Sequence, residues 1–135
     1  MRRLSRAVLL TLLAPVFAAA AEPSINVELN GGETAEGKCR LTFVVENKGT
    51  APIESLKLDL VVFNRENRVS RRLLAEMGPV RIAKTIVKIY SVDGECAEIR
   101  SVLINDVTAC TPGKRDDCLD ELALSSRMEG VRFFK

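Results

Sequence analysis

The chain has 135 residues, 20 of them basic and 18 acidic, and it contains no histidine and no tryptophan. A formal charge of +2 is too small for a protein that binds a polyanion, so nucleic acid is not an expected partner. The lack of histidine removes the commonest general base and a frequent zinc ligand, and the length suits one domain.

The amino-terminal segment has the three parts of a secretory signal peptide. Three arginines among the first six residues precede an apolar run over residues 7–17, and an alanine tract over 18–21 follows. The apolar run is shorter than the about 20 residues that span a bilayer, so cleavage after the alanine tract is expected rather than an anchor. We therefore predict a cleaved signal peptide over residues 1–21 and a single domain without a transmembrane span over 22–135.

Export also sets the charge and the compartment that the sequence predicts. Cleavage would remove three arginines and leave 17 basic residues against 18 acidic ones, so the exported domain would be nearly neutral. The predicted location is the periplasm, with secretion from the cell as the alternative.

Four cysteines lie in the predicted domain, and an even number in an exported chain indicates two disulfides. We favour a bridge between Cys110 and Cys118, which are eight residues apart across a polar turn. This choice leaves Cys39 and Cys96 as the second pair.

Metal-binding patterns are weak in this sequence. A zinc site would need C-x-x-C spacing or histidine, and neither occurs. Acidic residues at 116, 117, 120 and 121 could offer oxygen atoms to calcium, but their spacing is not that of a calcium-binding loop, so we interpret them as a solvated turn. No metal or other cofactor is predicted.

Short stretches of alternating or continuous apolar residues, separated by polar turns, predict β-strands. The predicted strands cover residues 24–30, 39–47, 54–63, 68–75, 82–91, 97–109 and 122–127. The last of them is ambiguous. We favour a turn near 116–120 followed by a strand, and a single helix over 115–127 is the alternative.

Seven short strands in a small exported chain predict an immunoglobulin-like sandwich of two antiparallel sheets, stapled by disulfides. In that strand order the second and sixth strands lie in opposite sheets and run the same way. Cys39 opens the second strand and Cys96 precedes the sixth, so both would lie at one end of the sandwich, within reach of one bridge.

A pattern of small motifs covers about residues 39–91. It consists of a V-x-N strand end, a V-F hairpin and a G-P connector, carried by Val45, Asn47, Phe63, Val69, Gly78 and Pro79. The pattern resembles exported bacterial immunoglobulin-like domains of the FxLYD type, and the whole chain is similar to small exported proteobacterial proteins of this size. Asn67 replaces the common hairpin glycine, which is tolerated because asparagine also accepts positive φ. The resemblance implies a fold and no particular activity.

Two groups of side chains are candidates for a binding surface. The basic group comprises Arg65, Arg68, Arg71 and Arg72. It is either an anion-binding patch or a charged edge strand that discourages aggregation, and we favour the edge strand. The apolar group, on outward strand faces and in the tail over 131–135, comprises Val44, Val61, Phe63, Ile86, Tyr90, Phe133 and Phe134. This apolar group is either a partner surface or a surface that the tail or the first strand covers. A further alternative is that the tail itself adds a strand to a sheet of the partner.

No catalytic motif accompanies these surfaces, since the chain lacks histidine, G-x-S-x-G and S-x-x-K. We therefore expect no enzymatic activity. The predicted function is a binding or accessory module that holds an envelope protein through a sheet face or edge. The alternative is a carrier of a small ligand or ion, such as an anion, calcium or a lipid.

Overall fold

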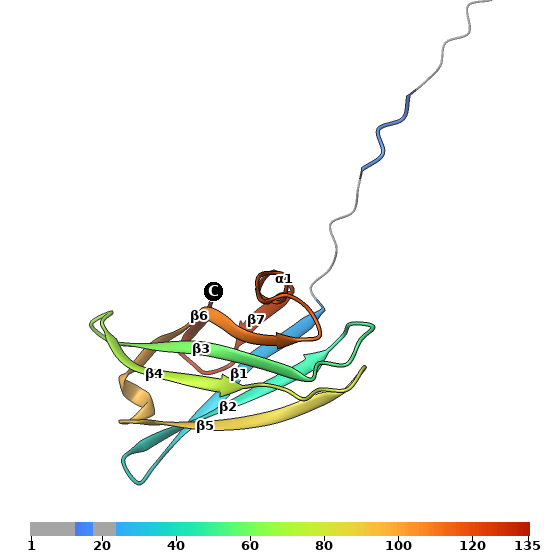
Figure 1. Cartoon of the computed structure of the whole chain (residues 1–135). Coiled ribbons are helices and arrows are strands. Elements are labelled where there is room, and N and C mark those ends of the chain that lie inside the picture. Colours follow the sequence, from blue (N-terminus) through green and yellow to red (C-terminus); the bar gives the residue numbers. More distant parts are fainter. Residues whose placement is uncertain (1–12, 18–23) are drawn as a thin grey trace, which may run out of the picture.

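Two β-sheets packed face to face make up the folded part of the chain (Figure 1). The structure is a computed structural model, and it describes residues 13–17 and 24–135. The elements are β1 (Ile25–Ala35), β2 (Lys38–Asn47), β3 (Ser55–Asn64), β4 (Val69–Glu76), β5 (Thr85–Asp93), the 3-10 helix η1 (Cys96–Glu98), β6 (Ile99–Thr111), α1 (Arg115–Asp120), β7 (Leu122–Ser126) and β8 (Arg132–Phe134). Apart from residues 13–17, the predicted signal peptide lies outside the described residues. None of the described helices is long and apolar enough to cross a bilayer.

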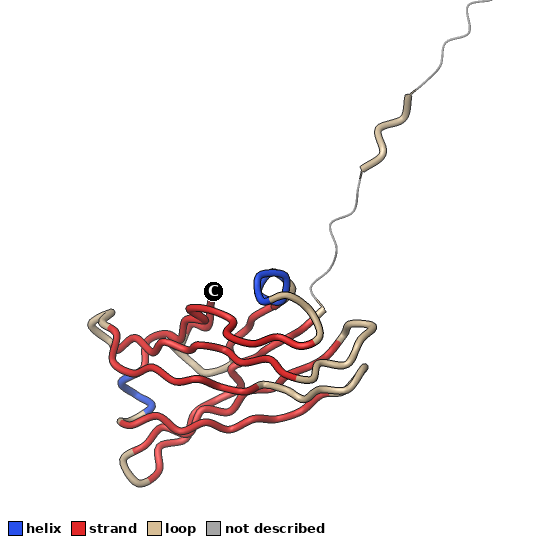
Figure 2. The backbone as a smooth tube through the Cα atoms, in the orientation of Figure 1, coloured by secondary structure: helices blue, strands red, loops and turns tan. Residues whose placement is uncertain are grey.

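The predicted all-β sandwich is confirmed, and Figure 2 shows strand over most of the described backbone. Its sheets are mixed, which corrects the prediction of seven antiparallel strands. One sheet has the order β5-β2-β1-β7 and the other β4-β3-β6-β8, with β7 parallel to β1 and β8 parallel to β6. The eighth strand forms because the tail over 131–135 buries Val131 and Phe133 when it pairs with β6.

The core lies between the inner faces of the two sheets. Side chains alternate along β2, where Leu41, Phe43 and Val45 are fully buried and their neighbours are partly exposed. The ring centroid of Phe43 lies 6.5 Å from that of Tyr90 on β5 and 5.7 Å from that of Phe133 on β8. Both edge-to-face contacts favour fixed ring positions. The tail strand β8 is therefore part of the core.

Both predicted disulfides are present. Cys39 on β2 is bonded to Cys96 in η1, with their Cα atoms 4.8 Å apart, and Cys110 on β6 is bonded to Cys118 in α1. Because η1 leads directly into β6, the first bridge joins the two sheets at one end of the sandwich, as the sequence predicted. Disulfides persist in oxidising compartments, which agrees with an exported protein.

Gly32 shows how β1 passes the first bridge. The strand continues beyond the predicted end at residue 30, and Gly32 pairs with Leu41 on β2. A Cβ atom at Gly32 would lie 3.0 Å from Sγ of Cys96 and 3.2 Å from Sγ of Cys39. It would also lie 2.8 Å from Cε of Met128, so glycine lets the strand backbone pass close to the sulfur atoms without displacing its neighbours.

Residues 115–127 form one short helix, where a turn was predicted, followed by the predicted strand, so the alternative of a single helix over this range is wrong. Helix α1 ends at Asp120, and β7 begins at Leu122. The side chain of Leu122 is buried, and the residue lies opposite Ile25 in the parallel pair with β1. Pairing with β1 buries this apolar side chain beside a core strand.

Candidate partner-binding face

The seven apolar residues predicted as a partner surface lie in three places rather than on one surface. Val44 is half-buried on the outer side of the β5-β2-β1-β7 sheet, between the buried residues of β2. Three others lie on the outer side of the β4-β3-β6-β8 sheet, namely Val61, Phe63 and Phe134. The remaining three pack against the core, namely Ile86, Tyr90 and Phe133.

The outward placement predicted for Ile86 and Tyr90 is wrong. Both lie opposite buried residues of β2, so they share its inner face. The outward residues of β5 are Val87 and Ile89, whose side chains are 60% and 50% exposed. Since β5 carries apolar side chains on both faces, its sequence shows the alternation but not which face is buried. Phe133 is also inside the core, where it contacts Phe43.

The outer side of the β4-β3-β6-β8 sheet carries six large apolar side chains. We call this set the outer apolar face, and it comprises Val61, Phe63, Val69, Leu74, Leu103 and Phe134. In the strand register Leu103 lies opposite both Val61 and Phe134, and Val69 lies opposite Phe63. Leu74 lies opposite Asp59, and Arg72 separates it from Val69 along β4. Val69 and Leu74 are 62% and 64% exposed. Neighbouring exposed apolar side chains, unlike scattered ones, mark interaction surfaces.

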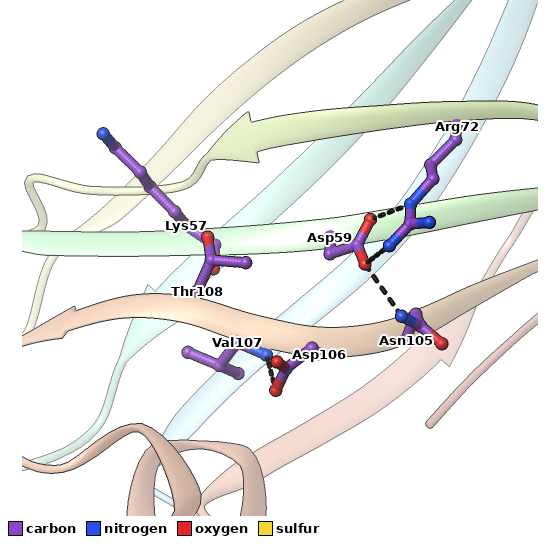
Figure 3. A network of polar contacts seen from close by, with 7 residues as sticks. All are labelled: Lys57, Asp59, Arg72, Asn105, Asp106, Val107 and Thr108. Carbon is purple, nitrogen blue, oxygen red and sulfur yellow. Dashed lines mark hydrogen bonds and ion pairs between the residues drawn. The ribbon is translucent and has the colours of Figure 1, made fainter.

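A charged group is built into the same side of the sheet. Asp59 on β3 is only 3% exposed. Figure 3 shows side chains from both neighbouring strands converging on it: Nε and Nη2 of Arg72 donate hydrogen bonds of 2.8 and 2.5 Å, and Nδ2 of Asn105 donates one of 2.8 Å. The hydrogen bonds from Arg72 hold the pKa of Asp59 below its ordinary value, and burial only partly opposes this. The carboxylate is therefore ionised and fully partnered beneath the surface.

Three of the four arginines predicted as a basic patch have partners within the fold. Arg65 donates to the carbonyl oxygens of Ala97 and Gly130, and Arg71 donates to that of Asp93. Arg72 is the partner of Asp59, as described above. Arg68 lies exposed in the turn before β4. Strand β4, which carries Arg71 and Arg72, lies at the edge of its sheet, and its role in discouraging aggregation stays a prediction.

A recess of about 850 Å³ lies beside the outer apolar face, where β6 and β8 meet the loop over 127–131. Its lining includes Phe63, Arg100, Arg132 and Phe134. Arg132 lies over the ring of Phe134, with Cζ 4.1 Å from the ring centroid. Arg132 was not predicted because β8 has three residues, too few for a strand signal, and Arg100 was not predicted because nothing in the pattern of β6 distinguishes it. The available clue to β8 was the alternation of apolar and basic residues from 131 to 133.

The acidic residues near Cys118 do not form a metal site in the structure. Within residues 13–17 and 24–135, no three acidic or cysteine side chains come close enough together to hold a metal ion. Asp116 and Asp117 instead occupy the first turn of α1, where negative charge is favourable for a helix.

Replacing Arg72 with glutamine should lower the free energy of unfolding at neutral pH measurably more than a surface substitution does, because the buried Asp59 carboxylate would lose its charged partner. Asp59 has a lowered pKa in the folded state, so its ionised form stabilises the fold. This contribution to the free energy of unfolding is complete above the ordinary carboxyl pKa, about 3.9, and it is lost as the pH falls through the pKa of the folded state. Urea unfolding between neutral pH and about pH 2 measures both effects.

Arg68→Gln is the matched control, since it removes the same charge from the adjoining turn. It should change the free energy of unfolding by less than about 0.5 kcal/mol. The Arg72→Gln variant should also lose stability less steeply than the wild type below about pH 4. Equal losses in the free energy of unfolding of the two variants would show that Arg72 does not stabilise the ionised carboxylate of Asp59.

Searches with this chain against protein-family models, curated proteins and solved structures found no match.

Proposed function

We propose that this protein is a non-catalytic module of the cell envelope that binds a protein partner through the outer apolar face. The observation that carries the proposal is the exposure of Val69 and Leu74, at 62% and 64%, on the same side of the sheet as Phe63, Leu103 and Phe134, with Val69 opposite Phe63. Such a surface is unfavourable in water and becomes favourable when a partner covers it. The exposed guanidinium of Arg72, between Val69 and Leu74 on β4, would add a charged contact within this surface, and the charges around the recess would form its polar rim.

An exported location supports this proposal. Two disulfides suit an oxidising environment, and the predicted signal peptide leads to the periplasm. The disulfides help a small domain to stay folded in the periplasm, where ATP-dependent chaperones are absent. The partner is accordingly a protein of the envelope.

The proposal includes kinship with exported immunoglobulin-like domains of the FxLYD type and with small exported proteobacterial proteins. Support comes from the strand order, in which β5-β2-β1 face β4-β3-β6 and the second and sixth strands lie in opposite sheets. The first and fifth strands both flank the second, as such domains would have them. The parallel strands β7 and β8 are additions to that pattern.

Capture from envelope extracts tests the proposed function. The exported protein is immobilised as wild type and as the Val69→Glu/Leu74→Glu variant, and bound proteins are compared. The variant should weaken capture of a specific envelope protein by about tenfold or more, because a buried unpaired carboxylate replaces an apolar contact. Val87→Glu is the control, since Val87 is 60% exposed on the other sheet and should leave capture unchanged.

Two results would contradict the proposal. One is a folded, monomeric protein that captures no specific partner. The other is an equal loss of capture in the Val87→Glu control. A thermal shift with calcium, simple anions or lipids, in the absence of a protein partner, would favour the carrier function instead.

A further inference from the structure

We infer that the recess beside β8 binds a carboxylate of an acidic segment of the partner protein, next to an apolar side chain of the same segment. We call it the arginine–phenylalanine recess, defined by Phe63, Arg100, Ser101, Arg132 and Phe134. The inference rests on the proposed function, because it specifies the chemistry of the partner that the outer apolar face would engage.

Arg132 is positioned to receive a carboxylate. Its guanidinium lies over the ring of Phe134, which is on the same side of β8 two residues later. Stacking occupies one face of the guanidinium and leaves its N–H edge available for two parallel hydrogen bonds to a carboxylate. Among the described residues, neither Arg132 nor Arg100 has an acidic side chain within 4.0 Å. The charge of both arginines is therefore open to a ligand.

Ser101 adds a buried polar group to the same recess. The residue is 7% exposed and lies between Phe63 on β3 and Arg132 on β8 in the strand register. No hydrogen bond of its hydroxyl is found among the described residues, and since no buried side-chain oxygen or nitrogen there lacks a partner, this hydroxyl is accessible from the recess rather than enclosed. A hydroxyl that can donate or accept, beside two arginines, suits a ligand oxygen.

The remaining lining keeps the recess positively charged and fixed in shape. Arg127 is already paired with Glu28, at 3.3 Å between Nε and Oε2, and Glu129 is the one acidic residue in the described lining. Arg65 donates to the carbonyl oxygen of Gly130, and the hydroxyl of Ser126 donates to that of Val131 at 2.7 Å. These hydrogen bonds hold the 127–131 loop in place without using the charges of Arg100 and Arg132.

The surroundings favour an acidic peptide over a polyanion. The recess opens beside the outer apolar face, so a ligand there meets a cationic site and an apolar surface together. A nucleic acid or an anionic bilayer would need a broad basic surface, and the nearly neutral charge of the chain does not supply one. A segment with glutamate or aspartate next to an apolar residue matches both features.

Nuclear magnetic resonance titration of the exported, disulfide-bonded protein tests the inference. The probes are an acetylated Glu-Leu-Glu-Phe amide and its glutamine counterpart, Gln-Leu-Gln-Phe amide, at up to about 10 mM. The acidic peptide should shift the amide signals of Ser101 and of β8, and the glutamine peptide should not. Arg132→Gln and Arg100→Gln should each raise the Kd about tenfold, because each removes a charged hydrogen-bond donor.

Arg115→Gln is the matched control, since it removes an equal charge from α1, away from the recess, and should leave the Kd unchanged. The inference is overturned if the acidic peptide causes no shifts, if both peptides bind equally, or if Arg115→Gln and Arg132→Gln weaken binding alike. Equal competition by inorganic phosphate or a short oligonucleotide would show a general anion site and overturn the choice of a peptide. If a partner is captured but the acidic peptide does not bind, the carboxylate site in the recess is refuted and the proposed function stands. If the peptide binds but no partner is captured, the proposed function is refuted and the carboxylate site stands.

Discussion

Replacing Cys39 and Cys96 together with alanine should lower the free energy of unfolding by about 4 kcal/mol. The bridge closes a loop over a sequence separation of 57 residues, and a loop of that length restricts the unfolded chain by about this amount on the chain-entropy model. A domain of this size has about 5–15 kcal/mol in total, so much of its stability depends on one bond. Urea unfolding of the oxidised wild type and of the double variant measures the difference.

The second bridge provides the control for loop length. Cys110 and Cys118 are eight residues apart, so their joint replacement with alanine should cost about 2.5 kcal/mol on the same model. The order of the two losses matters more than either value. A larger loss at the short loop would show that the bridges stabilise the folded state locally, by packing, rather than by restricting the unfolded chain.

Phe43→Ala should lower the free energy of unfolding by about 3–5 kcal/mol, as is usual when a fully buried aromatic ring is removed. The ring contacts Tyr90 and Phe133, so the cavity would open between β5, β2 and β8. Since Phe133 anchors β8, the variant should also lose amide protection in β8 before other strands. Urea unfolding and hydrogen exchange measure the two effects.

Val87→Ala serves as the control for the ring deletion. Val87 is apolar but 60% exposed, and its truncation should cost less than about 0.5 kcal/mol. Hydrogen exchange in Phe43→Ala that is uniform over all strands would contradict the special role of Phe133. It would mean that β8 is held by its pairing with β6 and not by the aromatic contact.

Local patterns in the sequence predicted the interior of the fold well. Leu41, Phe43 and Val45 alternate with polar or smaller side chains, and β2 lies within one residue of its predicted range. The pairing of Cys39 with Cys96 followed by elimination from the choice of Cys110 and Cys118, and the predicted order of the strands supported it because covalent reach limits the possible partners. A six-residue helix before β7 also agreed with the predicted turn.

Features that depend on contacts between distant segments could not be predicted from local sequence patterns. The pair of glycines at 31 and 32 signals the end of a strand, but β1 continues to Ala35 because its hairpin partner β2 pairs with it along that length. The sequence does not show which face of β5 is buried, because the neighbouring residues Ile86 and Val87 are both apolar. Strand β8 forms where β6 offers an edge to pair with and where Phe133 can enter the core.

The candidate site was only partly predictable for the same reason. Phe63 and Val61 were visible as outward residues of an apolar strand, but the charges that flank them come from other parts of the chain. Arg132 reaches the recess through a parallel pairing between β6 and β8. No local pattern reports a pairing of segments that lie about 30 residues apart.

The contact between Gly32 and the sulfur atoms of Cys39 and Cys96 makes these three positions depend on one another during evolution. A descendant that kept both cysteines would accept alanine at position 32 only if the sulfur atoms and Cε of Met128, at 2.8 Å from the new Cβ, shifted. Loss of the bridge would relieve the sulfur contacts and leave the one with Met128, so the effect of a substitution at position 32 depends on which residues occupy positions 39, 96 and 128.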